Sequence, residues 1–271
     1  MKTQIDFKSF DGTVLNGILS IPDNQNTKGV FLLMHGIPSG KDEWGFYTDM
    51  ANTLLANGYA SFRFDFRYNG NVEPQPMTEL TLSGLLTDIE AAYRMIKERY
   101  CDKKVYVVGT SCGGGVTVKW LNTFKHEIEI CFLMAPVLDY VYETIGITRN
   151  EFLEEGILPP DALKTIDFGY FNQDIKYGTS FFDDAIVFDG KSELNFCKNK
   201  IIIMQGTKDT VVPISITKQM IADLPIKLIE IPEADHGFAV DGDDYLTFPE
   251  TKQNHHLVYQ EIIKELDSVA E

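Results

Sequence analysis

Short apolar runs alternate with amphipathic segments along most of the 271 residues. Eight runs have the length and the aliphatic, β-branched and aromatic content that are typical of strands. They lie at 3–9, 13–21, 28–34, 59–66, 104–109, 128–136, 200–206 and 226–232. Helical spacing is found at 43–58, at 83–100, directly after 110, near 214–223 and from about 250. Strands that alternate with helices in this way predict a mostly parallel sheet covered on both faces.

Local signals mark the ends of several predicted elements. The pair "DG" at 11–12 joins the first two strands and predicts a hairpin. Gly58 follows the first helix where a C′ glycine is expected, and Ser83 is placed to cap the second helix.

The alternation stops over 137–198, which is rich in aromatic residues, Asp and Gly. Long inserts in compact domains usually have a function. We therefore expect one α/β domain, 1–271, in which 137–198 is an inserted lid. The alternative is a surface elaboration without a role toward substrate.

Charge and composition narrow the classes of partner. The formal net charge of −16 disfavours phosphate backbones and anionic lipid surfaces, so we expect neither nucleic acid nor membrane as a partner. The first residues lack the apolar core of a secretory signal, and the apolar runs are too short to span a bilayer. Four cysteines without CxxC or metal spacing are expected to be reduced thiols, in a soluble cytoplasmic protein. A homodimer is left open.

The segment "GTSCG" at 109–113 fits G-x-S-x-G between a predicted strand and a predicted helix, as that motif requires. Ser111 then lies on a sharp turn as the nucleophile, and Gly109 and Gly113 leave the room that such a turn needs. Cys112 offers a backbone N–H to an oxyanion at the helix N-terminus, where a thiol pKa can be lowered. A phosphate loop is disfavoured because its Lys is missing.

A general base and its acid are sought at the carboxyl ends of strands. Of five histidines, His35 directly follows a predicted strand and His236 lies in the turn after the last strand, which leaves these two as candidates. The order Ser, acid, His selects His236 as the base. Asp209 follows the strand at 200–206 and is expected to orient the imidazole. Asp65, also at a strand end, is interpreted as structural.

His35, the candidate not chosen as the base, opens "HGIPSG" at 35–40. In this loop the Ile37 N–H is a candidate second oxyanion donor beside that of Cys112. We expect His35 to hold the loop by hydrogen bonding rather than to transfer protons.

Five segments together resemble the α/β-hydrolase superfamily: "HGIPSG", "FDFRYNG", "GTSCGG", "GTKDTVVP" and "EADHGF". Within it, the chain is similar to compact serine esterases of the feruloyl (cinnamoyl) esterase and monoacylglycerol-lipase or serine-aminopeptidase-like group. The resemblance implies an eight-stranded sheet with helices on both faces and a small lid after the sixth strand. It implies a triad of Ser111, Asp209 and His236, with the oxyanion held by Ile37 and Cys112. No metal or organic cofactor is expected.

The function expected from these residues is hydrolysis of a small carboxylic ester through an acyl-enzyme. Aromatic residues in 137–198 favour aryl or short-to-medium acyl groups, feruloyl esters among them. Asp139 and Tyr140 are tentative contacts to a substrate hydroxyl. Two alternatives stay open: thioesterase or peptidase activity on the same triad, and a non-hydrolytic small-molecule receptor on the same fold.

Overall fold

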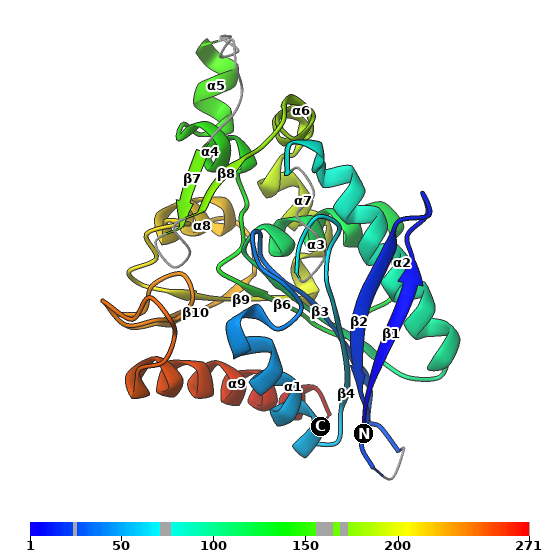
Figure 1. Ribbon diagram of the computed structural model, residues 1–271. Coiled ribbons are helices and arrows are strands. Elements are labelled where there is room, and N and C mark those ends of the chain that lie inside the picture. Colours follow the sequence, from blue (N-terminus) through cyan, green and yellow to red (C-terminus); the bar gives the residue numbers. More distant parts are fainter. Residues whose placement is uncertain (24–25, 71–76, 156–164, 169–172, 271) are drawn as a thin grey trace.

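A central sheet of eight strands organises the protein (Figure 1). The computed structural model describes residues 1–23, 26–70, 77–155, 165–168 and 173–270. The strand order is β1-β2-β4-β3-β5-β6-β9-β10; β1 and β2 run antiparallel to their neighbours and the other strands run parallel. The predicted mostly parallel sheet is therefore confirmed. Its strands are β1 (Lys2–Lys8), β2 (Val14–Ser20), β3 (Val30–Met34), β4 (Ala60–Phe64), β5 (Val105–Thr110), β6 (Cys131–Met134), β9 (Ile201–Gly206) and β10 (Lys227–Ile231).

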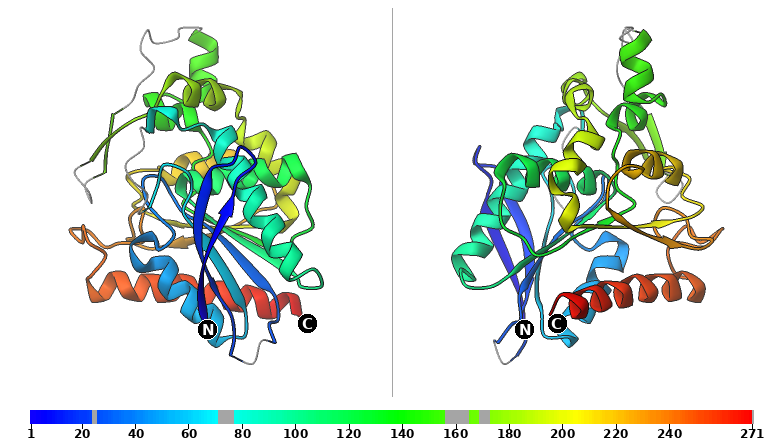
Figure 2. Two further views of the ribbon diagram at one scale, coloured as in Figure 1. Left: turned by 45° about the vertical axis from the view of Figure 1, so that its right-hand side comes forward. Right: turned by 180° about the vertical axis from the view of Figure 1, so that it is seen from behind.

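Helices cover both faces of the sheet (Figures 1 and 2). Side chains alternate between the faces along each strand, so Phe31 and Leu33 join one apolar cluster and Leu32 joins the other. One face packs against α1 (Phe46–Ala56) and α9 (Pro249–Ala270). The opposite face packs against α2 (Leu82–Arg99), α3 (Ser111–Phe124), α7 (Gly190–Cys197) and α8 (Ile214–Ile221).

Helix ends agree with the sequence patterns except at two positions. Gly58 follows the α1 C-cap with φ +85°, as predicted. The cap of α2 is Thr81 rather than Ser83, because Thr81 has the extended backbone of an N-cap and its Oγ1 accepts from Gly84 N at 3.0 Å. Ser83 lies inside the helix and instead binds Asp184. The predicted helix at 43–58 begins only at Phe46, because Glu43–Gly45 form a 3-10 turn, η1. Two further 3-10 turns are η2 (Met77–Glu79) and η3 (Lys198–Lys200).

The segment between β6 and β9 lies outside the main sheet. Besides α7 it contains α4 (Tyr140–Ile145), α5 (Arg149–Glu155), α6 (Thr179–Val187) and a two-stranded sheet of β7 (Thr165–Phe168) and β8 (Gln173–Lys176). The part from α4 to α6 projects from the side opposite the two termini (Figures 1 and 2). Tyr177 and Phe181 stack there at 4.3 Å and are buried. Residues 156–164 and 169–172 of the predicted lid lie outside the described residues, and its role stays a prediction.

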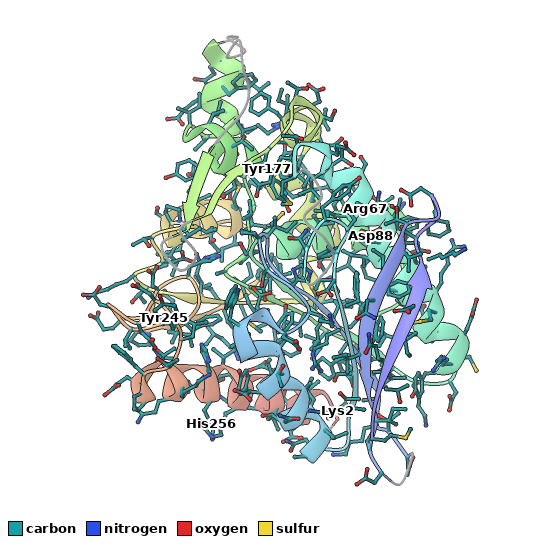
Figure 3. The ribbon with its side chains drawn as sticks, viewed as in Figure 1. Lys2, Arg67, Asp88, Tyr177, Tyr245 and His256 are labelled. Atoms are coloured by element: carbon teal, nitrogen blue, oxygen red, sulfur yellow. The ribbon has the colours of Figure 1, made fainter. Side chains whose placement is uncertain are left out.

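Arg67, which follows β4, ties the N-terminal hairpin to α2 (Figure 3). Its guanidinium donates to Asp88 with contacts of 2.7–3.1 Å and to Asp11 at 2.8 Å. Asp88 is fully buried. No helix in the described part of the chain is both long and apolar enough to cross a membrane.

Candidate active site

Ser111 occupies a strained turn between β5 and α3. Its φ is +52°, in the left-handed region, which costs a non-glycine residue about 1–2 kcal/mol. Close packing surrounds the turn: a Cβ at Gly113 would lie 2.3 Å from the carbonyl oxygen of His35, and one at Gly109 would lie 2.7 Å from Thr117 Oγ1. The predicted lack of room at these glycines is thus confirmed. The turn places Ser111 at the positive end of α3.

His236 is oriented by Asp209. The imidazole Nδ1 lies 3.0 and 3.1 Å from the two carboxylate oxygens. Asp209 is itself fixed: its Oδ1 accepts from the N–H groups of Val211 (3.1 Å) and Val212 (2.8 Å), and its Oδ2 accepts from Gln205 Nε2 (3.1 Å). Because Nδ1 serves Asp209, Nε2 is the ring nitrogen left for proton transfer.

The surroundings of His236 increase its basicity. Burial acts to lower the pKa of the imidazole, but the charge and hydrogen bond of Asp209 outweigh it, with help from Glu143 and Asp235. The net result is a pKa above the usual 6.5. A more basic imidazole suits proton transfer from a serine hydroxyl.

Ser111 and His236 line one pocket, and its other walls are mostly apolar. Trp44 contributes from η1, Phe46 from the start of α1, and Phe238 and Leu246 from the segment between β10 and α9. The remaining lining residues are Gly36, Ile37, Pro38, Ser39, Glu43, Thr110, Gly237, Asp244 and Tyr245. Tyr245 is 77% exposed and lies on the outer part of this segment (Figure 3). The pocket therefore suits an uncharged group attached to the reacting carbonyl.

The loop after β3 is held by buried polar groups. His35 Nδ1 donates to the carbonyl oxygen of Gly36 at 2.5 Å, and its Nε2 accepts from Phe66 N at 2.9 Å. Burial lowers the pKa of His35 to about 4, so the ring stays neutral. Asp65 accepts from the Lys41 ammonium at 2.5 Å. The predicted structural roles of His35 and Asp65 are confirmed.

The two candidate oxyanion donors are backbone amides on either side of Ser111. Cys112 N–H belongs to the first turn of α3, and Ile37 N–H to the loop after β3. Neither amide forms a hydrogen bond to another described residue, so both are available to a substrate oxygen. Their role as oxyanion donors stays a prediction.

The Cys112 thiol differs from expectation. Its side chain is 3% exposed and joins the apolar core. Burial raises the pKa of the thiol to about 12, against a lowering influence from the Tyr140 hydroxyl. The lowering that a helix N-terminus can cause is therefore not found at this thiol, because burial of the sulfur outweighs it.

Asp139 and Tyr140 do not line the pocket of Ser111 and His236. Asp139 caps α4 through Tyr142 N at 3.0 Å and accepts from Arg149 N at 2.9 Å. The Tyr140 hydroxyl, fully buried, donates to the carbonyl oxygen of Cys112 at 2.5 Å. Both side chains thus have structural partners, and substrate contact by either stays a prediction.

Sequence reasoning missed Glu43, whose Oε2 accepts from Gly36 N at 3.0 Å in the pocket. The spacing of 43–58 predicts that Glu43 is an ordinary helix residue. In the structure the η1 turn instead directs its carboxyl toward the loop after β3. Among the described residues, no group of three or more His, Cys, Asp or Glu side chains is arranged to hold a metal ion.

Comparisons with solved structures show the same fold. Est1E from Butyrivibrio proteoclasticus with bound ferulic acid aligns with a TM-score of 0.72 at 20% identity, over 96% of this chain and 99% of that one. A dienelactone hydrolase from Anabaena variabilis aligns with a TM-score of 0.64 at 16% identity, over 96% of this chain and 95% of that one. At these identities, the likeness concerns the fold.

Comparisons by sequence cover parts of the chain. The family model described as serine aminopeptidase, S33 matches residues 25–156. The quorum-quenching protein AidA from Acinetobacter baumannii is 32% identical over 96 residues, which are 35% of this chain and 31% of that protein. The chain thus matches about a third of that relative's length. The family model covers just under half of the 271 residues, and the solved structures show that the chain has the α/β-hydrolase fold.

Proposed function

We propose that this protein is a serine hydrolase that cleaves carboxylic esters through an acyl-enzyme. The observation that carries the proposal is the His236–Asp209 pair, bonded at 3.0 Å and opening on a pocket that Ser111 lines from a strained turn. A residue held in a sparsely populated conformation beside an oriented base is typical of an activated nucleophile.

In the proposed reaction, His236 Nε2 takes the proton from Ser111 while the serine oxygen attacks the ester carbonyl. The negative charge that develops on the carbonyl oxygen is received by the N–H groups of Cys112 and Ile37. His236 then gives its proton to the leaving alcohol. Water then attacks the acyl-enzyme while His236 takes its proton. His236 returns the proton to the Ser111 oxygen as the acid is released.

The apolar pocket walls favour an aryl or short-to-medium acyl ester. Trp44, Phe46 and Phe238 offer flat surfaces for an aromatic or alkyl group. Est1E, which shares the fold, has been solved with ferulic acid bound. Esters of hydroxycinnamic acids therefore belong in the first substrate panel, beside p-nitrophenyl acetate, butyrate and octanoate.

The decisive experiment compares the wild-type protein with Ser111→Ala. We expect the wild type to hydrolyse p-nitrophenyl butyrate and to be labelled by a fluorophosphonate at Ser111. The alanine variant should keep its thermal unfolding midpoint and lose activity by about 10³-fold or more. Full activity of the variant would refute the proposal, and a wild type that binds an ester tightly without labelling would indicate a receptor.

A second candidate is aminopeptidase activity, which the description of the matching family model favours. The triad geometry serves amides as well as esters. Aminoacyl p-nitroanilides test it: turnover of these substrates at rates comparable to the best ester would replace the ester proposal.

A further inference from the structure

Glu43 places a carboxyl group in the pocket beside Ser111 and His236, and the proposed ester chemistry gives it no task. Its Oε2 accepts a hydrogen bond from the backbone N–H of Gly36 at 3.0 Å. Gly36 directly precedes Ile37, the residue whose amide is the candidate second oxyanion donor. The carboxyl thus contacts the loop at the peptide next to that donor.

The carboxyl and the nucleophile approach Gly36 closely. A Cβ added at Gly36 would lie 3.1 Å from Ser111 Cβ and 3.2 Å from Glu43 Oε1. Both groups therefore lie near one point, and a charge on Glu43 acts on the reacting atoms at short range.

The backbone at Glu43 is unusual. Glu43, Trp44 and Gly45 have φ of +44°, +55° and +93°, three consecutive left-handed residues of which only the glycine adopts this conformation without strain. Strained backbone persists where the surroundings enforce it and gathers at functional sites. Here it turns the Glu43 side chain back toward the loop after β3, away from the outer surface of α1.

Several groups set the charge of Glu43. Burial raises its pKa to about 7, while the Gly36 N–H, the nearby Ser39 hydroxyl and a charged His236 act to lower it. The Ser39 hydroxyl is buried and, as placed, is not aligned for a hydrogen bond. Tyr47 faces the carboxyl from α1 and Asp244 lines the same pocket. A large share of molecules therefore carry a neutral Glu43 near pH 7.

We propose that Glu43 is a positioning residue: its carboxyl holds the Gly36 amide, and through it the Ile37 N–H, in place while negative charge develops on the carbonyl oxygen of the substrate. The carbonyl oxygen of a neutral carboxyl accepts the Gly36 hydrogen bond and presents no like charge to the intermediate. An ionised carboxylate accepts the same bond but repels the intermediate. This inference rests on the proposed ester hydrolysis.

The test compares Glu43→Gln with Glu43→Ala on p-nitrophenyl butyrate, between about pH 5.5 and 9. The exposed Asp49→Asn, also near the start of α1, controls for a general loss of negative charge. We expect wild-type kcat/KM to rise as His236 loses its proton and to fall as Glu43 ionises. Glu43→Gln should keep kcat within about threefold and lose the fall at high pH, because its amide oxygen still accepts from Gly36 and cannot ionise.

Glu43→Ala removes the acceptor altogether. Its kcat should fall by about tenfold or more at the wild-type pH optimum with KM changed less than about threefold, since a displaced donor acts on the transition state rather than on ground-state binding. Three results would overturn the inference: wild-type kcat in Glu43→Ala, an unchanged fall at high pH in Glu43→Gln, or equal losses in both variants. If the wild type neither hydrolyses esters nor reacts with a fluorophosphonate, the proposed function fails and this inference fails with it.

Discussion

Replacing Asp209 by Asn tests the orientation of the His236 ring. The Oδ1 atom accepts two backbone N–H groups, from Val211 and Val212, so the asparagine must place its carbonyl oxygen there. Its NH₂ group then takes the place of Oδ2 and faces two donors, Gln205 Nε2 and His236 Nδ1. An imidazole that accepts from this NH₂ group carries its proton on Nε2, which disables that nitrogen as a base, although Nδ1 also lies 3.1 Å from the Oδ1 position.

The expected cost of this wrong tautomer is about 10⁴-fold in kcat, which corresponds to roughly 5 kcal/mol of transition-state stabilisation. The assay is hydrolysis of p-nitrophenyl butyrate, with circular dichroism and thermal unfolding to show that the variant is folded. Asp235→Asn is the matched control, because Asp235 lies in the same turn and bonds the His236 backbone N–H rather than the ring. A loss of less than tenfold in folded Asp209→Asn, or equal losses in both variants, would refute the assigned ring orientation.

Three further predictions follow from single contacts. The rising limb of kcat/KM should lie above pH 6.5, because the base must be neutral and the pKa of His236 is raised; in Asp209→Asn, without the carboxylate charge, this limb should move to lower pH. Tyr140→Phe removes the hydroxyl that donates to the Cys112 carbonyl, which should cost about 1–3 kcal/mol in urea unfolding and leave the acyl preference unchanged. A changed preference with unchanged stability would instead favour a substrate contact. Arg67→Ala leaves the fully buried Asp88 without its cation and should cost about 3–5 kcal/mol in the same assay, whereas a loss below about 1 kcal/mol would contradict the structural role of this pair.

The sheet was predictable because its signal is local. A buried strand such as β3 reads as a continuous apolar run, and "DG" marks the hairpin turn before β2. The α2 cap was misplaced because Thr81 and Ser83 are both capping residue types, and only the extended backbone at Thr81 distinguishes them. The cap position depends on the backbone conformation of the preceding loop, and a short sequence window does not determine that conformation.

The candidate triad was identifiable for a related reason. Ser111 directly follows β5, Asp209 and His236 lie in the loops after β9 and β10, and parallel strands bring their carboxyl ends to one edge of the sheet. Periodicity alone therefore predicts that they meet. Asp139 satisfies the same rule, following β6, yet its carboxylate is used by Tyr142 N and Arg149 N. Position at a strand end selects candidates, and hydrogen-bond partners decide among them.

Glu43 is a pocket residue that the rule of strand ends does not identify. It follows no strand directly, and its side chain reaches the pocket only because Glu43 and Trp44 adopt a left-handed backbone that neither residue prefers. No propensity predicts such a turn, since the contacts that enforce it come from other parts of the chain. The same applies to Cys112, whose place at a helix N-terminus favours a thiolate until burial of the sulfur reverses the sign. In both cases the charge state depends on what the side chain packs against, and packing partners distant in the sequence are not revealed by the residues on either side.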